Sequence, residues 1–105
     1  MLAHPNTLAE FNAWANRRLY AACATLTPDE IAKNRDAFFK SILGTLNHLL
    51  LVDILYRERL EGQSSTFKSL DEILHQDFQS LSDHQVEEDQ RWIERSRRLT
   101  EIGPF

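Results

Sequence analysis

The sequence predicts an all-α protein, an antiparallel helical bundle with three long helices in a single domain of residues 1–105. Three observations support this fold class. Apolar residues recur at helical spacing, the chain has only three Gly and three Pro, and Ser/Thr-x-x-Glu patterns precede the periodic segments. Gly and Pro interrupt helices, whereas a Ser or Thr followed three residues later by Glu caps a helix N-terminus. The chain is also long enough for one small core.

Two of these capping patterns lie in the first third of the chain. Thr7–Glu10 predicts the start of a first long helix, which we place at roughly Asn6–Ala24. Thr27–Glu30, whose second residue is Pro, predicts one short turn of helix that ends near Lys33. We interpret Asp36 as the N-cap of the next long helix.

The second long helix, Ser41–Gly62, is the segment on which we expect the rest of the chain to pack. It is apolar on two opposite sides. One side carries Gly44, His48, Leu51, Val52 and Leu55, and the other carries Phe39, Leu43, Leu46 and Leu50. A surface helix has a single apolar stripe, so we expect this helix to be covered on both sides. His48 is an ionisable group in the middle of the apolar run, and any chemistry of this helix is expected to begin there.

A third long helix is predicted from the Ser69–Glu72 capping pattern to about Thr100. Its apolar stripe consists of Leu70, Leu74, Phe78, Leu81, Trp92 and Leu99. Gln85 and Glu88 interrupt this stripe, and His84 lies at its edge. Short connections make sequential helices antiparallel neighbours, so we expect the second and third long helices to form an antiparallel hairpin.

Charge and composition exclude several classes of function. The formal net charge is −4 and no basic stripe is present, so we expect no nucleic-acid partner. The apolar run is too short to span a membrane, and without a signal peptide we expect a cytoplasmic protein. The single cysteine, Cys23, excludes an internal disulfide and is expected to be buried and inert. No Gly-rich phosphate loop or nucleophile motif is found, so no catalytic or cofactor-binding residue is assigned.

Phe11–Leu19, with the sequence FNAWANRRL, begins a longer pattern. The pattern continues through Phe39–Ile42, Thr45–Leu50, Asp53, Tyr56, Arg59, Leu60 and Gly62. In order and spacing it resembles the DinB-like proteins (the DinB/YfiT superfamily), which open with Y/F-N-x-W-A-N-x-R-L. The chain after Phe67 resembles them only loosely, as a long third helix. The resemblance implies a four-helix bundle, often dimeric, whose relatives include metal-dependent thiol S-transferases and hydrolases as well as many members without a known activity.

The metal site that the resemblance implies uses three histidines, and His48 matches the ligand on the second helix. The other two ligands lie four residues apart on a later helix. The only other histidines here are His4, His75 and His84, and no two of them have that spacing. The chain is also expected to stop where the family continues into a fourth helix. A catalytic site of this kind needs three protein ligands and an open position, so we predict no tight Zn²⁺ or Ni²⁺ site within one chain.

A second interpretation retains a metal site. If the second and third long helices form a hairpin about Ser65, equal rise per residue places His48 level with residue 83. His84 then lies at the same height, and Glu88 lies one turn further along the same side. These three side chains would form a polar cluster that holds Zn or Ni. Otherwise the polar gap faces solvent or a dimer partner, and His48 is a hydrogen-bonded core histidine.

Two functional hypotheses follow. In the first, the chain is a self-associating helical scaffold with an incomplete family metal site and no activity as an isolated chain. In the second, it is a metal-dependent thiol S-transferase or hydrolase that acts on a small thiol or other small molecule, its site completed in trans or by His84 and Glu88. The first predicts a homodimer, because a groove without its fourth helix exposes apolar side chains. These are expected to be Leu46, Leu50 and Ile54, or Leu51 and Leu55, depending on helix rotation.

Overall fold

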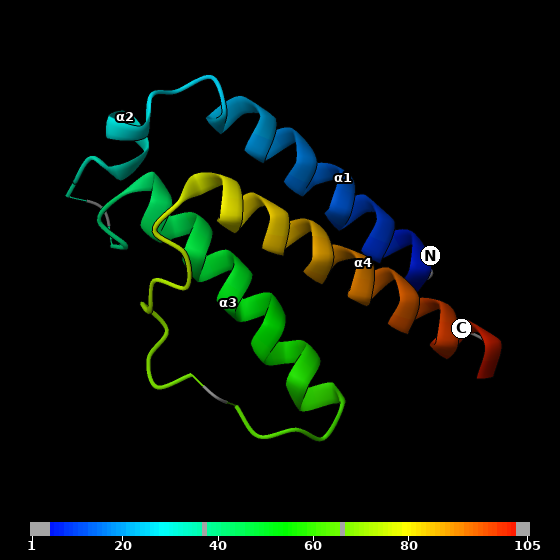
Figure 1. Ribbon diagram of the computed structural model, residues 1–105. Coiled ribbons are helices and arrows are strands. Elements are labelled where there is room, and N and C mark those ends of the chain that lie inside the picture. The colour runs from blue at the N-terminus through cyan, green and yellow to red at the C-terminus, as the bar shows by residue number, and fades with distance from the viewer. Residues whose placement is uncertain (1–4, 37, 66, 103–105) are drawn as a thin grey trace.

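The computed structural model describes residues 5–36, 38–65 and 67–102, with the side chains of those between 6 and 98. Its helices are α1 (Pro5–Cys23), α2 (Pro28–Ala32), α3 (Ile42–Leu60) and α4 (Phe78–Ile102), as Figure 1 shows. The predicted all-α bundle with three long helices is therefore confirmed. His4 and the side chain of Leu99, to which predictions were attached, lie outside the described part.

The predicted N-caps of the first three helices can be compared with the residues at which these helices begin. α1 already includes Pro5, so the predicted cap at Thr7 lies inside the helix and is wrong. For α2 the prediction is confirmed, because the Thr27 hydroxyl accepts the backbone N–H of Glu30 at 3.2 Å. α3 is capped by Ser41, whose Oγ accepts the Gly44 N–H at 2.9 Å. Asp36, the predicted cap of this helix, instead lies before it at a positive φ of 55°.

α4 begins at Phe78, nine residues later than the predicted start at Ser69. The Ser69–Glu72 pattern does form part of its local bonding, since Glu72 Oε2 accepts the Lys68 N–H at 2.9 Å, but no helix follows. Asp77 caps α4 instead, its Oδ2 accepting the Ser80 N–H at 2.8 Å. A capping residue satisfies only one or two backbone N–H groups of the first turn. It therefore does not by itself determine where the helix starts.

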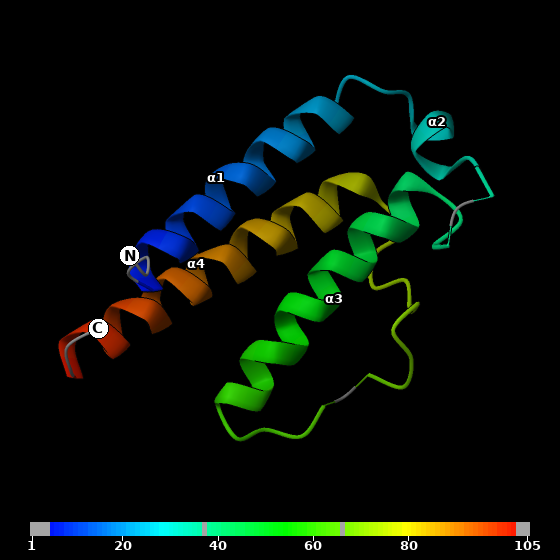
Figure 2. The same cartoon turned by 180° about the vertical axis from the view of Figure 1, so that it is seen from behind.

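α4 is the central helix, with α1 on one side and α3 on the other (Figures 1 and 2). α1 runs antiparallel to α4, because residues early in α1 meet residues late in α4. Asn6 Nδ2 donates to Ser96 Oγ at 3.2 Å, and Asn16 Nδ2 donates to Asp89 Oδ1 at 3.0 Å. This antiparallel pairing joins the first and last helices of the described chain.

α3 and α4 run in the same direction, so the predicted antiparallel hairpin is wrong. Their contacts advance together along both helices. The hydrogen-bonded pairs are Asp53 with Gln85, Arg57 with Glu88, and Leu60 with Arg95. The argument that placed His48 level with His84 depended on that hairpin and therefore no longer holds.

The connection of residues 61–77 makes the parallel arrangement possible. It has to return along all of α3, which at 1.5 Å per residue is about 28 Å long. On the way it covers the second side of α3: Phe67 and Leu74 pack against the core, and the Leu70 carbonyl lies 2.9 Å from His48 Nδ1. The two apolar sides of α3 are thus covered by different segments, one by α4 and the other by this connection.

The core joins all four helices. Its buried members are Tyr20, Cys23, Ile31, Leu43, Leu46, Leu50, Ile54 and Leu81. Cys23 is buried as predicted, and burial raises the pKa of its thiol. The predicted exposure of Leu46, Leu50, Leu51 and Ile54 is wrong, because each is less than a tenth exposed. Leu55, the remaining member of the predicted set, is half-buried. α3 is rotated so that Leu46, Leu50 and Ile54 face the core.

Asn47 holds the end of the connection against α3. Its side chain is completely buried. The carboxamide Nδ2 donates to the His75 carbonyl at 3.0 Å, and Oδ1 accepts the His75 N–H at 2.9 Å. Nδ2 also donates to the Leu43 carbonyl at 2.9 Å. A carboxamide supplies both a donor and an acceptor, so Asn47 satisfies both backbone groups of His75.

We expect Asn47→Ala to lower the free energy of unfolding by about 2 kcal/mol, because it leaves two backbone groups of His75 without partners. Urea unfolding measures the loss, and hydrogen exchange at the His75 amide should become faster. Asn34→Ala is the matched control, since exposed Asn34 only accepts the Asp36 N–H. Equal losses in the two variants would contradict this role of Asn47.

Candidate functional site

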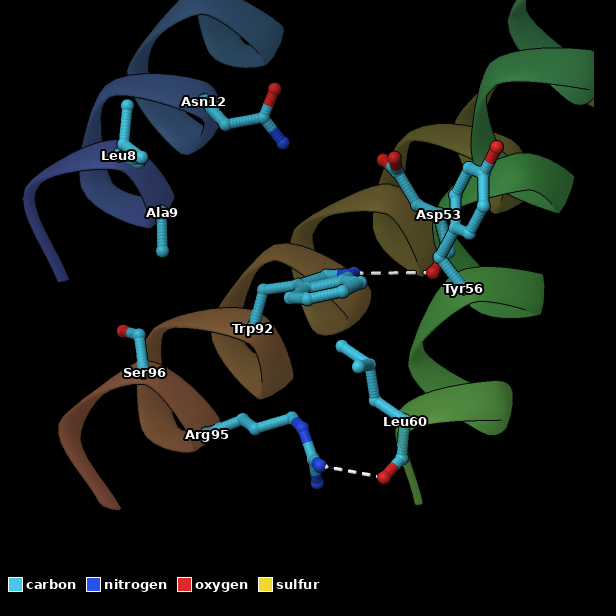
Figure 3. A pocket seen from close by; sticks show the side chains of 9 residues that line it. All are labelled: Leu8, Ala9, Asn12, Asp53, Tyr56, Leu60, Trp92, Arg95 and Ser96. Atoms are coloured by element: carbon cyan, nitrogen blue, oxygen red, sulfur yellow. Dashed lines mark hydrogen bonds between the residues drawn. The ribbon is translucent and has the colours of Figure 1, made fainter. Parts of the chain in front are cut away.

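A pocket of about 540 Å³ opens between α1, α3 and α4 (Figure 3). It lies beside the first half of α1, the second half of α3 and the second half of α4. The lining residues are Leu8, Ala9, Asn12, Asp53, Tyr56, Leu60, Trp92, Arg95 and Ser96. Small-molecule sites are typically concave, mostly apolar spaces of about 300–1,000 Å³ with a few polar groups. This pocket has those properties and is the candidate functional site.

Trp92 and Arg95 attach this part of α4 to α3. The indole Nε1–H of Trp92 donates to the backbone carbonyl of Asp53 at 3.2 Å. Arg95 Nη2 donates to the Leu60 carbonyl at 2.8 Å. The last carbonyls of a helix lack partners within it and favour a nearby cation, so Arg95 stabilises the C-terminal end of α3. Both bonds join the α3 wall of the pocket to the α4 wall.

Asp53 places a carboxylate in the wall of the pocket. Gln85 Nε2 donates to its Oδ2 at 3.1 Å. Burial raises the pKa of Asp53 to about 6, and the charges of Asp89 and Glu88 act in the same direction. The hydrogen bond from Gln85 opposes the shift. Asp53 is therefore a carboxyl group with a raised pKa in the wall of a mostly apolar pocket.

A row of buried and half-buried polar groups links the pocket wall to α1. Gln85 Nε2 donates at 2.9 Å to Asp89 Oδ1, which also accepts from Asn16 Nδ2 at 3.0 Å. Burial raises the pKa of Asp89, while these two hydrogen bonds act to lower it. One carboxamide of α4 thus connects a carboxylate of α3 with a carboxylate of its own helix, and Asn16 extends the row to α1.

A buried ion pair between Arg57 and Glu88 lies behind the pocket. Arg57 Nε donates to Glu88 Oε2 at 2.6 Å, and the Glu88 side chain is only 1% exposed. Arg57 also reaches Glu61 Oε2 at 3.2 Å. The hydrogen bond to Glu88 raises the pKa of Arg57 further. Burying either charge alone would be very unfavourable, so each is held by the other.

The structure separates the three residues that were predicted to share a polar cluster. His48 stacks on Phe39, with the ring centroids 3.9 Å apart, and its Nδ1 lies 2.9 Å from the Leu70 carbonyl. His84 Nδ1 lies 2.8 Å from His75 Nε2, and burial lowers the pKa of His84. Glu88 is bound to Arg57. The cluster that the hairpin argument assembled is therefore not formed within the chain.

These positions do not fit the metal site that the resemblance implies. Among the residues with described side chains, no three His, Cys, Asp or Glu groups lie close enough together to hold a metal ion. A three-ligand site needs such convergence. The role of His48 as a metal ligand stays a prediction.

Three of the residues that line the pocket were already singled out from the sequence. Asp53 and Tyr56 belong to the pattern that resembles DinB-like proteins, and Trp92 was placed on the apolar stripe of the third helix. No pattern indicated that Arg57 pairs with Glu88, because the two residues are 31 positions apart. The pocket itself was missed, since it exists only where three helices diverge.

The chain is a small all-α bundle of three long helices and one short helix, and its central helix α4 carries buried polar residues. The model of the DinB family matches residues 1–104, and the chain belongs to this family. None of the curated proteins and none of the solved structures compared with the chain gave a match. Across its described residues, the chain has no helix long and apolar enough to cross a membrane.

We expect Glu88→Gln to lower the free energy of unfolding by about 1–3 kcal/mol, because the buried guanidinium of Arg57 then keeps only the more exposed Glu61 as its counter-charge. Denaturant unfolding at neutral pH measures the loss. The control is Glu87→Gln, which makes the same chemical change at the exposed neighbouring position and should change stability by less than about 0.5 kcal/mol. A small loss for Glu88→Gln would show that the pair contributes little.

Proposed function

We propose that this DinB-family chain is a self-associating helical scaffold without catalytic activity as an isolated chain. The observation that carries the proposal is a surface between α1 and α3 that contains two cavities and exposes apolar side chains; we call this surface the groove. The groove is defined by Leu8, Asn12 and Leu19 of α1 together with Leu49, Tyr56 and Leu60 of α3. The pocket described above is one end of it, and a second cavity of about 290 Å³ beside Leu19 and Leu49 is the other.

Each helix contributes one continuous side to the groove. Residues three, four or seven positions apart lie on the same side of a helix, and the groove residues of α1 and α3 follow this spacing. Their apolar members are strongly exposed: Leu8 56%, Leu19 40%, Leu49 41%, Tyr56 55% and Leu60 56%. Since full burial of such a side chain is worth about 1.5–3 kcal/mol, covering the five would contribute on the order of 5 kcal/mol.

A second copy of the chain is the occupant that this surface favours. Phe11, which is 63% exposed, lies three residues after Leu8 on α1, and its ring contacts the exposed ring of Trp14. We propose that these two rings form the apolar ridge that enters the groove of the second copy. A surface that carries both a ridge and a groove is complementary to itself, as a two-fold interface requires. Large exposed apolar patches are rare on monomers and mark interaction sites. These features support a homodimer in which the α1 and α3 faces of two copies pack together.

Association should be coupled to stability, so the melting temperature should rise with protein concentration. We expect light scattering to give a dimer for the wild-type chain and a monomer for Leu49→Glu. Leu49 is suitable because it is 41% exposed within one chain, whereas the same change at the fully buried Leu50 would disrupt the fold.

Val86→Glu is the matched control. Val86 is 56% exposed on α4 and lines a different cavity, between α1 and α4. This variant should remain a dimer. A wild-type monomer whose melting temperature is unchanged over a hundredfold dilution would overturn the proposal.

The metal-dependent alternative makes an opposite prediction for metal content. Protein purified without a polyhistidine tag should carry far less than one Zn or Ni per chain in elemental analysis, because the described side chains offer no three-ligand site. A content near one metal per chain that His48→Ala abolishes would favour the thiol S-transferase or hydrolase hypothesis. In that case His84→Ala would show whether His84 contributes a ligand.

A further inference from the structure

We propose that the pocket at the α1–α3–α4 junction is a binding site for a small apolar monoamine, whose ammonium group pairs with the Asp53 carboxylate. This inference goes beyond the proposed scaffold function. It concerns the end of the groove that contains Asp53 and Trp92, whereas the test of self-association uses Leu49 at the other end.

The Asp53 carboxylate lacks a counter-charge. Within the described part of the chain its only hydrogen-bond donor is Gln85, which binds Oδ2, and no Lys, Arg or His forms an ion pair with it. The other oxygen, Oδ1, accepts no hydrogen bond from these residues. A half-buried carboxylate without a cation is unfavourable, so a ligand that supplies a cation there would be stabilised.

Asn12 places a second polar group in the same pocket, and rotation of its carboxamide by 180° would direct the oxygen towards the cation. Its carboxamide extends from α1 into the space between α1 and α3, opposite the wall that carries Asp53 (Figure 3). No hydrogen bond within the described chain occupies its side-chain oxygen. An ammonium group has three N–H donors, and a carboxylate together with an amide oxygen would satisfy two of them.

The remaining walls favour an apolar body with one charge. Tyr56, Leu60 and Trp92 surround the middle of the pocket, and the indole of Trp92 lies across its base (Figure 3). Aromatic faces attract a cation as well as an apolar group. Arg95 at the far end donates to the Leu60 carbonyl and lies 3.8 Å from Glu61 Oε1, so its charge is already paired. The lining residues offer a second ammonium group no further carboxylate, so the pocket selects monoamines over diamines.

The probe is phenethylamine, with 2-phenylethanol as its neutral counterpart of the same shape. Titrations follow the Trp92 indole N–H resonance by NMR, assigned with a Trp14→Phe variant. At pH 7.5 the amine should bind roughly tenfold or more tightly than the alcohol, as expected for a charge-assisted hydrogen bond. Putrescine, a diamine, should bind more weakly than phenethylamine.

Asp53→Asn should reduce the preference for the amine to less than about twofold, because the shape is kept and only the charge is removed. The control Asp83→Asn removes a carboxylate that is exposed on α4 and bound to Gln79, and it should keep the preference. Equal affinity of the wild-type chain for amine and alcohol, or a preference that survives Asp53→Asn, would overturn the proposal.

The pH dependence tests the same pairing in the wild-type chain, even if a variant fails to fold. Burial places the pKa of Asp53 at about 6. Below this value Asp53 is neutral, so amine affinity should fall as pH decreases while alcohol affinity stays constant. The titratable or charged groups that act on Asp53 or share its pocket are Tyr20 of α1, Tyr56 of α3, and Glu88, Asp89 and Arg95 of α4. A flat profile for the amine would contradict the pairing.

The two proposals fail separately. If Leu49→Glu remains a dimer while Asp53→Asn loses its amine preference, the groove interface is wrong and the amine site holds. If the wild-type chain dimerises through Leu49 but binds amine and alcohol equally, the amine site is wrong and the scaffold holds.

Discussion

The ion pair between Arg57 and Glu88 determines how α3 lies on α4. Glu88 is 1% exposed and its Oε2 lies 2.6 Å from Arg57 Nε, so neither charge tolerates separation. Sliding α3 by one turn, or reversing it, would leave Glu88 buried without a counter-charge and Arg57 with Glu61 alone. This contact therefore favours the parallel direction of the two helices. That direction in turn requires the long connection of residues 61–77, which Asn47 fixes to α3 through the backbone of His75.

The sequence predicted the elements better than their arrangement. Helical periodicity and the Thr27 cap depend on neighbouring residues, and the structure confirms three long helices and the short α2. The start at Ser69 was wrong because a capping pattern can bond locally without a helix after it. The hairpin was wrong because helix direction is set by contacts such as Arg57–Glu88, between residues far apart in the chain. No local pattern encodes such a contact.

The candidate site shows the same limit. The polar gap on the third helix was visible in the sequence, and Gln85 and Glu88 are indeed buried inside the bundle. Their partners were not predictable, because they depend on the register of α3 against α4. With parallel helices, Glu88 meets Arg57 and Gln85 meets Asp53, while His84 meets His75 and His48 meets the connection. The histidines therefore lie outside the central network.

Asp53 also relates the proposed self-association to the proposed amine binding. Asp53 is solvated through the open side of the pocket, and its desolvation already dominates the rise of its pKa. A second copy that covers the groove would remove this water and make the negative charge less favourable. An enclosed ammonium group would offset that cost. Amine binding and self-association would then strengthen each other, because a coupling free energy acts equally on both equilibria. The strengthening depends on the charge of Asp53, so an asparagine at this position would leave the two events uncoupled.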